Sequence, residues 1–77
     1  MKTTFGNKHR CLMRWITDKR LLSGFTQHSL SKELDRPQSF VSKYENGERR
    51  LEFIEVIEIC AFLDADVMEL VSLIKKS

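Results

Sequence analysis

The fold of this 77-residue chain is decided by residues 26–47, which read TQHSLSKELDRPQSFVSKYENG. We predict two short helices in this stretch, over residues 27–34 and 38–45. Pro37 separates them, because proline lacks a backbone donor and pushes the preceding residue into an extended conformation. The same proline suits the first turn of the second helix, since its fixed backbone angle is already helical. The stretch therefore predicts two helices joined by a tight turn.

One side of each predicted helix is apolar. Leu30 and Leu34 lie one turn apart in the first helix, and Val41 and Tyr44 point inward from the second. The other side of the second helix is polar and carries Gln38, Ser39, Ser42 and Lys43. Such side chains can hydrogen-bond to base edges in the major groove of DNA. The pattern is that of a helix-turn-helix, in which the second helix reads duplex DNA.

The rest of the chain also shows helical spacing. We predict further helices over residues 8–22, 52–63 and 67–75. Valine and isoleucine are frequent in residues 53–59, so a strand is conceivable there. Apolar residues recur every three to four positions over a dozen residues, however, and this spacing favours a helix.

Residues that begin or end helices stand at the predicted boundaries. Gly24 follows the first helix closely, as a helix-ending glycine does. Thr26 is a candidate N-cap for the second helix, and Asp66 with Glu69 three residues later resembles a capping box for the last. The expected architecture is an all-α fold of five helices, in a single domain over residues 1–77.

The net charge of +2 hides an uneven distribution. Residues 1–50 contain eleven Lys or Arg and five Asp or Glu, a net charge of +6. Residues 51–77 contain two Lys and six Asp or Glu, a net charge of −4. The basic part includes the predicted DNA reader, whereas phosphate would repel the acidic part. We therefore expect residues 51–77 to lie on the far side of the domain from DNA.

Metal sites, cofactors and catalysis are not indicated. Cys11 and Cys60 are too widely separated to form a metal-binding pair. Cys60 is expected in the core because it lies in an apolar run, while Cys11 is either a packed or an exposed thiol. His9 and His28 have no acidic or Cys partners at ligand spacing. We predict no cofactor, no small-molecule substrate and no enzymatic activity.

The location of the protein follows from two features of the sequence. No apolar run approaches the roughly 18 residues needed to cross a membrane. Residues 1–6 lack the apolar core of a secretory signal. We expect a cytoplasmic protein with no membrane partner.

From about Ile16 to Val71 the chain resembles the phage repressor and Cro-type (Xre-like) helix-turn-helix family. The resemblance rests on LSGFTQ at 22–27, LSxxL at 30–34, PQSFVSKYENGERR at 37–50 and ICAFL at 59–63. These segments occur in the order and spacing of the family. The resemblance implies a lambda-repressor-like domain of five helices, double-stranded DNA as a partner, and a bacterial or phage origin.

The resemblance also implies which residues contact DNA. Base edges are assigned to Gln38, Ser39, Ser42 and Lys43. Contacts to phosphate or sugar are assigned to Gln27, Phe40, Asn46, Gly47, Arg49 and Arg50, with the backbone N–H groups of the Asn-Gly pair meeting a phosphate. Three roles stay open for Lys43, which is a guanine reader, a phosphate contact or a solvated side chain. Arg20 and Glu45 match a pair that forms a largely buried salt bridge in relatives.

Three positions depart from the family pattern. Asp35 occupies the turn position often held by glycine, and aspartate tolerates left-handed backbone better than most residues. Ser31 replaces a usual alanine and is still small enough for close helix packing. Pro37 replaces a Ser or Thr, so the recognition helix loses a side-chain cap. None of these changes threatens the predicted fold.

We predict that the chain is a sequence-specific transcriptional regulator, repressor-like, that binds a palindromic operator as a homodimer. One recognition helix reads only about four base pairs, and two-fold pairing doubles the site. The predicted dimer interface is centred on the last helix and contains Phe62, Met68, Val71, Leu73 and Ile74. The alternative is an antitoxin or adaptor that uses the same fold to hold a toxin or another protein.

Overall fold

Five helices make up the part of the chain that the structure describes, residues 6–77 of a computed structural model. They are α1 (Asn7–Leu22), α2 (Gln27–Glu33), α3 (Phe40–Glu45), α4 (Phe53–Leu63) and α5 (Val67–Lys76). Residues 6–77 contain no strand, so the predicted all-α fold is confirmed and the alternative of a strand over 53–59 is wrong. Residues 1–5, part of the segment examined for a secretory signal, lie outside the described range.

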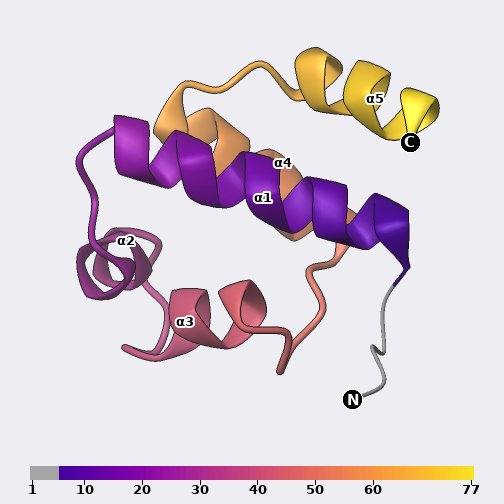
Figure 1. The fold of residues 1–77 in the computed structure, drawn as a ribbon. Coiled ribbons are helices and arrows are strands. Elements are labelled where there is room, and N and C mark those ends of the chain that lie inside the picture. The colour runs from indigo at the N-terminus through magenta and orange to yellow at the C-terminus, as the bar shows by residue number, and fades with distance from the viewer. Residues whose placement is uncertain (1–5) are drawn as a thin grey trace.

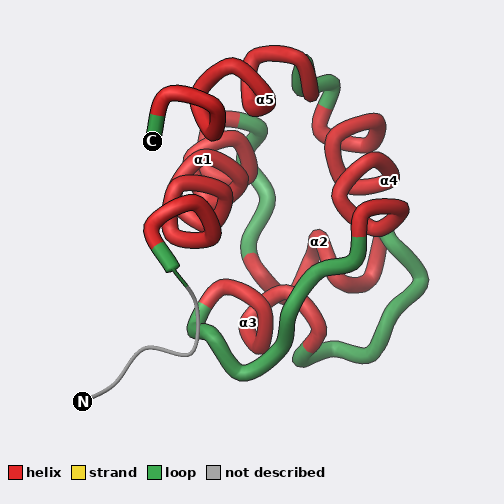
Figure 2. Tube along the Cα trace, turned by 90° about the vertical axis from the view of Figure 1, so that its right-hand side faces the viewer, coloured by secondary structure: helices red, strands yellow, loops and turns green. Residues whose placement is uncertain are grey.

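Helix α1 crosses the middle of the molecule, and the other helices lie around it (Figure 1). Helices α2 and α3 lie on one side of α1, and α5 lies on the opposite side. A view turned by 90° shows the same separation (Figure 2). The predicted reading helix is therefore far from α5. The expectation that all of residues 51–77 lie on the far side does not hold for α4, whose Glu55 pairs with Arg36 and Arg49, next to α3 in the chain. None of the described helices is long and apolar enough to span a membrane.

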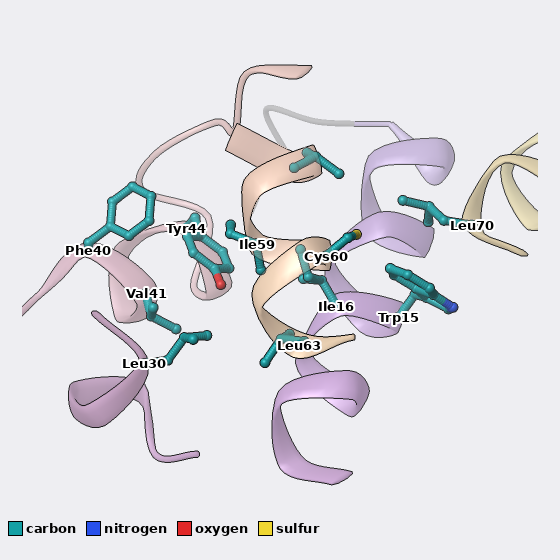
Figure 3. Packing of buried hydrophobic residues seen from close by; sticks show 11 residues of the cluster. Trp15, Ile16, Leu30, Phe40, Val41, Tyr44, Ile59, Cys60, Leu63 and Leu70 are labelled. Carbon is teal, nitrogen blue, oxygen red and sulfur yellow. The ribbon is translucent and has the colours of Figure 1, made fainter. Parts of the chain in front are cut away.

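The core is built from all five helices. Ile16, Leu30, Val41, Tyr44 and Ile59 are almost completely buried, and Trp15, Phe40, Val56, Cys60, Leu63 and Leu70 complete the cluster (Figure 3). The prediction that Cys60 is a core residue is confirmed. Phe25 is only partly buried and packs on the edge of the cluster, against the ring of Phe62. Cys11 is half-buried.

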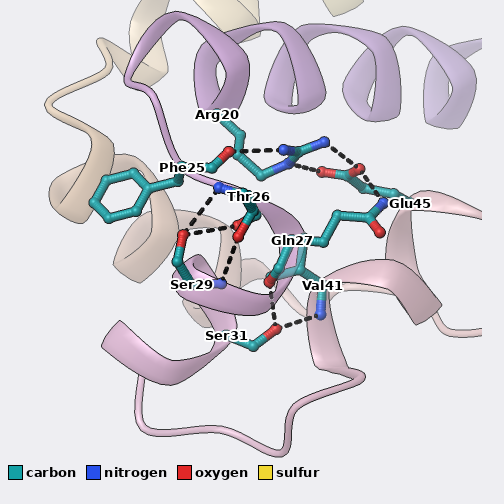
Figure 4. Close-up of polar contacts among 8 residues, drawn as sticks. All are labelled: Arg20, Phe25, Thr26, Gln27, Ser29, Ser31, Val41 and Glu45. Atoms are coloured by element: carbon teal, nitrogen blue, oxygen red, sulfur yellow. Dashed lines mark hydrogen bonds and ion pairs between the residues drawn. The ribbon is translucent and has the colours of Figure 1, made fainter.

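Helices α2 and α3 approach closely because a small polar side chain lies between them. Ser31 is completely buried in α2. Its hydroxyl donates to the carbonyl oxygen of Gln27 at 2.9 Å and accepts from the backbone N–H of Val41 at 3.0 Å (Figure 4). The second bond satisfies one of the backbone donors that the first turn of any helix leaves unpaired. The expectation that Ser31 allows close packing is confirmed.

The turn between α2 and α3 contains the left-handed residue that the sequence predicted. Asp35 has φ +59°, and the next N–H group, of Arg36, donates to the Ser31 carbonyl at 3.0 Å. Helix α3 begins at Phe40, two residues later than predicted. Pro37 instead starts a tight turn, which the Phe40 N–H closes by donating to the Pro37 carbonyl at 2.9 Å.

The end of α1 and the start of α2 are fixed by residues at those positions. Gly24 has φ +82°, a conformation that favours glycine, and follows the last turn of α1 as predicted. The Thr26 hydroxyl accepts from the N–H of Ser29, whose own hydroxyl accepts from the N–H of Thr26, both at 2.9 Å. The predicted N-cap of α2 is confirmed, and the second hydrogen bond, to Ser29, completes a capping box.

Helix α5 is attached mainly to α1. Leu70 is its only buried residue in the described structure. The Asp66 carboxylate caps the helix as predicted by accepting from the Met68 N–H at 3.0 Å. Glu69 does not complete a capping box, because its carboxylate lies 3.4 Å from the Lys19 ammonium of α1. At the other end of α5, Lys8 donates to the carbonyls of Ile74 and Ser77, each at 2.8 Å.

Candidate nucleic-acid interface

The outward side of α3 and of the turn before it presents polar side chains. Gln38, Ser39 and Lys43 are exposed, and Ser42 is half-buried. The Ser42 hydroxyl donates to the Ser39 carbonyl at 3.1 Å. Because α3 begins late, Gln38 and Ser39 lie in the turn, and Ser42 and Lys43 lie in the helix itself, where Lys43 is the more exposed of the two. The four side chains predicted to read bases therefore do lie together.

A buried ion pair fixes the end of α3 to α1. Arg20 donates through Nε to Glu45 Oε2 at 2.7 Å and through Nη2 to Oε1 at 3.0 Å. Its Nη1 donates to the Phe25 carbonyl at 2.8 Å (Figure 4). Both charged side chains are less than a tenth exposed, and the hydrogen bond with Glu45 raises the pKa of Arg20. The predicted structural salt bridge is confirmed.

Gln27 is part of this network. Its side-chain amide donates from Nε2 to Glu45 Oε1 at 2.9 Å, so the first residue of α2 is tied to the last residue of α3. We predicted a phosphate contact for this glutamine. The structure gives its side chain a place in the internal network, and the phosphate contact stays a prediction.

Phe40 does not lie where the resemblance placed it. Its side chain is only 5% exposed, so the expectation that the ring contacts sugar or phosphate is wrong. The ring packs edge-on against Tyr44, with centroids 5.3 Å apart. The guanidinium carbons of Arg36 and Arg49 lie over it, at 4.6 and 5.0 Å from its centroid. The ring is covered because α3 packs its first turn, as well as Val41 and Tyr44, against the rest of the protein.

Arg49 is also engaged within the protein. It donates from Nη1 and Nη2 to the two carboxylate oxygens of Glu55, each at 2.8 Å, and from Nη1 to the Arg50 carbonyl at 2.9 Å. Arg36 Nη2 lies 3.1 Å from Glu55 Oε2. These contacts hold the pKa of Glu55 at about 2, mainly through the hydrogen bond from Arg49. Arg49 was predicted as a simple phosphate contact, but its charge is paired with a buried carboxylate.

The loop after α3 differs from expectation in one respect. Gly47 has φ +86°, which suits a loop that reverses direction. The N–H groups of Asn46 and Gly47, expected to meet a phosphate, instead donate to the carbonyls of Ser42 at 3.0 Å and Tyr44 at 3.4 Å. They close the last turn of α3, as the end of a helix requires. The exposed side chains of Asn46 and Arg50 remain on this surface.

The comparisons with known proteins agree with this geometry. A family model described as Helix-turn-helix matches residues 16–70. Control protein C.MunI of a Mycoplasma species is 32% identical over 76 residues, which cover 99% of this chain and 95% of that protein. A solved structure, an XRE-family like protein from Pseudomonas syringae pv. tomato str. DC3000, is 38% identical. It superposes with a TM-score of 0.81 over 91% of this chain and 88% of that one.

This chain belongs to the XRE-type helix-turn-helix family. The family consists of DNA-binding transcription regulators and is not a class of enzymes. The resemblance found in the sequence is thereby confirmed, and α2 and α3 are the helix-turn-helix of this regulator. Among residues 6–77, no group of three or more His, Cys, Asp or Glu side chains is placed to hold a metal ion.

Of the five apolar residues predicted for a dimer interface, all but Phe62 are on α5, which lies on the opposite side of α1 from α3 (Figure 1). Phe62 is on α4 and packs against Phe25. Four of them are exposed: Phe62, Met68, Val71 and Leu73. Ile74 is partly buried against the core and lines, with Leu12, Leu51, Phe53, Val56, Val67, Leu70 and Val71, a groove of about 310 Å³. Phe53, which also lines the groove, and Ile54 are 73% and 63% exposed on α4. Neither residue was among those predicted for the interface.

The residue of this helix-turn-helix protein that the sequence analysis missed is Glu55. It lies four positions before the buried Ile59, so it occupies the inward stripe of α4. An acidic residue on an apolar stripe indicates a buried charge that needs a partner. That signal was present, but the partners, Arg36 and Arg49, come from two separate loops.

Proposed function

We propose that this chain is a sequence-specific transcriptional regulator that binds a palindromic operator in double-stranded DNA as a homodimer, with α3 in the major groove. The regulator is repressor-like and acts by its position on DNA. The single observation that carries the proposal is the exposed group that Gln38 and Ser39, in the turn before α3, form with Lys43 on α3, while the other side of that helix is buried.

The chemistry of these side chains fits base edges. A glutamine amide pairs with N6 and N7 of adenine, a lysine ammonium with O6 and N7 of guanine, and a serine hydroxyl with either donor or acceptor. Asn46 and Arg50, on the loop that follows, are proposed to contact phosphate, which positions the protein but carries no sequence information.

Reading a base requires a helix that does not move, and α3 is only six residues long. A free helix of this length is not stable in water. Its end is fixed by the pair of Arg20 and Glu45, and its start by the bond from the Val41 N–H to Ser31. This bracing supports a role for α3 as a reading element.

A homodimer is proposed because a single α3 presents few side chains. Two copies related by a two-fold axis read two half-sites about 34 Å apart, or a multiple of that distance. The exposed apolar residues of α5 lie on the side away from α3, so pairing there leaves both reading helices free (Figure 1). We propose that Met68, Val71 and Leu73 are at the centre of this interface, with Phe62 and Ile74 beside them.

Three biological roles share these properties: a control protein like C.MunI, a prophage repressor, and an antitoxin. The genes beside this one separate them, since a methyltransferase, an integrase or a toxin gene each accompanies one role. The similarity to Control protein C.MunI supports the controller role for this chain.

Base reading is measured by selecting a bound sequence from random duplexes and comparing it with a scrambled duplex. Gln38→Ala and Lys43→Ala are expected to weaken binding to the selected site by about 1–3 kcal/mol and to relax the base preference. Lys76→Gln on α5 is the matched control for loss of a charge. Equal losses on both duplexes would show that the two side chains touch only the backbone.

Pairing is measured by sedimentation of the wild type, Met68→Glu and Leu73→Glu. Both side chains are exposed in a single chain, so the substitutions leave the fold intact. A two-fold interface receives each new charge twice, and we expect monomers that no longer bind the two half-sites cooperatively. A wild type that stays monomeric at tens of micromolar, or variants that pair normally, would contradict the dimer.

The second candidate function is an antitoxin or adaptor, and the exposure of the large apolar side chains Phe53, Ile54 and Met68 favours it. Such a protein would bind DNA weakly and without sequence preference. A regulator instead loses affinity steeply as salt rises, because cations are released from the DNA when phosphates are neutralised. Binding to the selected duplex across a range of salt concentrations distinguishes the two.

A further inference from the structure

A pocket lies at the start of α3, beside the proposed reading residues. It has a volume of about 280 Å³ and is lined by Arg36, Pro37, Ser39, Phe40, Lys43 and Arg49. Three of the six side chains are cations, and no acidic side chain lines the pocket. The acid nearest to these cations, Glu55, is buried behind them.

The two arginines of the pocket are held in place from inside. Arg36 and Arg49 both lie over the ring of Phe40 and both pair with the Glu55 carboxylate. Glu55 is 8% exposed at its side chain and also accepts from the N–H of Glu52 at 2.9 Å. One buried carboxylate thus positions two guanidinium groups, and the stacking on Phe40 limits their rotation.

The pocket keeps positive charge after this pairing. Glu55 neutralises one of its three cations, and Glu58 is 60% exposed and no closer than 4.0 Å to Arg36. Arg36 binds Glu55 through Nη2 alone, so its other donors exceed what the ion pair uses. The ring of Phe40 is only 5% exposed, with the guanidinium groups of Arg36 and Arg49 over it, so it offers no surface for a base to stack on. An anion therefore suits this pocket better than a base does.

We propose that this pocket binds one phosphate group of the DNA backbone through Arg36, with the base-reading side chains of Ser39 and Lys43 at its edge, and that Glu55 is the positioning residue that holds Arg36 and Arg49 for it. This inference rests on the proposed function, because the phosphate is supplied by the duplex that α3 reads. A phosphate fixed next to Gln38 and Ser39 sets how far the turn enters the groove, which links a backbone contact to base reading.

The direct contact is measured by replacing single phosphates of the selected duplex with neutral methylphosphonates, for the wild type and for Arg36→Gln. At one position in each half-site, the wild type is expected to lose roughly ten- to a hundredfold in affinity. At that position Arg36→Gln should lose nothing further, because its contact is already gone. Additive losses at every position would overturn the assignment of Arg36.

The salt dependence of binding gives an independent measure. Arg36→Gln is expected to lower the slope of log affinity against log salt by about 1, with the base preference kept. Arg36→Lys should restore most of the slope, and Lys76→Gln should leave it unchanged. A slope in Arg36→Gln equal to that of the wild type would overturn the phosphate site.

The positioning role of Glu55 predicts a different result. Glu55→Gln keeps the shape of the side chain but removes the charge that holds the two arginines. We expect equal or tighter binding to scrambled duplex, a steeper salt slope, and a several-fold lower ratio of specific to non-specific affinity. A change of folded fraction alone would lower both affinities together, and that result would overturn the positioning role.

The two proposals fail in distinguishable ways. A wild type that binds all duplexes equally, yet loses affinity at one methylphosphonate, would overturn sequence reading and support the pocket. A wild type that reads sequence but is insensitive to every methylphosphonate near α3 would support the proposed function and overturn the pocket. No duplex binding at all would overturn both.

Discussion

Helices α3 and α5 are attached to the same domain in different ways. The polar contacts that fix α3 are buried: Arg20 with Glu45, and the Ser31 hydroxyl with the Val41 N–H. Those of α5 come from Lys8 and Lys19 and are largely exposed, and only Leu70 is buried. Buried polar contacts demand one geometry, whereas exposed ion pairs contribute little and tolerate displacement. The reading helix is thus held rigidly, and the helix proposed to meet a partner is not.

The largest expected effect comes from removing one partner of the buried pair at the end of α3. Glu45→Ala leaves the Arg20 guanidinium buried without its carboxylate, and we expect the free energy of unfolding to fall by about 3–5 kcal/mol. Urea unfolding measures this. Lys19→Ala, which breaks the exposed pair with Glu69, is the matched control and should cost less than about 1 kcal/mol. Equal losses would remove the contrast between the two helices.

A smaller effect is expected from acid, through Glu55. Its pKa in the folded protein is lowered to about 2 from an ordinary value of 4.5. The contribution of Glu55 to the free energy of unfolding is therefore fully present above pH 4.5. This contribution, on the order of 2 kcal/mol, is lost as the pH falls toward 2. Urea unfolding at several pH values should show this loss in the wild type but not in Glu55→Gln. Parallel curves for the two proteins would mean that the buried ion pairs do not stabilise the fold.

The third prediction concerns Tyr44, the one buried residue of α3 with an unsatisfied group. Its hydroxyl has no hydrogen-bond partner among residues 6–77, and burial raises the pKa of the phenol. Tyr44→Phe should increase the free energy of unfolding by about 1 kcal/mol, because an unpaired polar group is no longer buried. Thermal unfolding monitors the change. A clear loss of stability would mean that the hydroxyl is bonded in solution.

The smallest effect is expected at the C-terminal end of α5. Lys8→Met removes the donors that meet the carbonyls of Ile74 and Ser77 but keeps an apolar side chain of similar length. We expect a loss of about 0.5 kcal/mol or less in overall stability, together with faster amide hydrogen exchange in the last turn of α5. Unchanged exchange there would show that Leu70 and its neighbours hold this helix without the lysine.

Local information was enough to predict the five helices, the left-handed Asp35 and the cap at Thr26, since each depends on residues within a few positions of one another. The pair of Arg20 and Glu45 is not local, and it came from the family resemblance. The late start of α3 was missed because proline is compatible with both a helical first turn and the tight turn found here.

The surroundings of Phe40 could not be derived from spacing. The ring lies on a buried face that is wider than the stripe of Val41 and Tyr44 suggested, and its cover comes from Arg36 and Arg49. Those arginines converge because both pair with Glu55 of α4. From a sequence alone, charged side chains in loops are expected to be solvated. Whether they form ion pairs depends on contacts between distant segments.

The size of the side chain at position 31 bears on how the operator affinity of such regulators can change in evolution. Its hydroxyl is the spacer between α2 and α3, and a larger side chain there would push the reading helix outward by the width of the added atoms. We expect substitutions at this position to alter operator affinity while every DNA-contacting residue stays the same. The depth of α3 in the groove would then be set by the size of one side chain that never meets DNA.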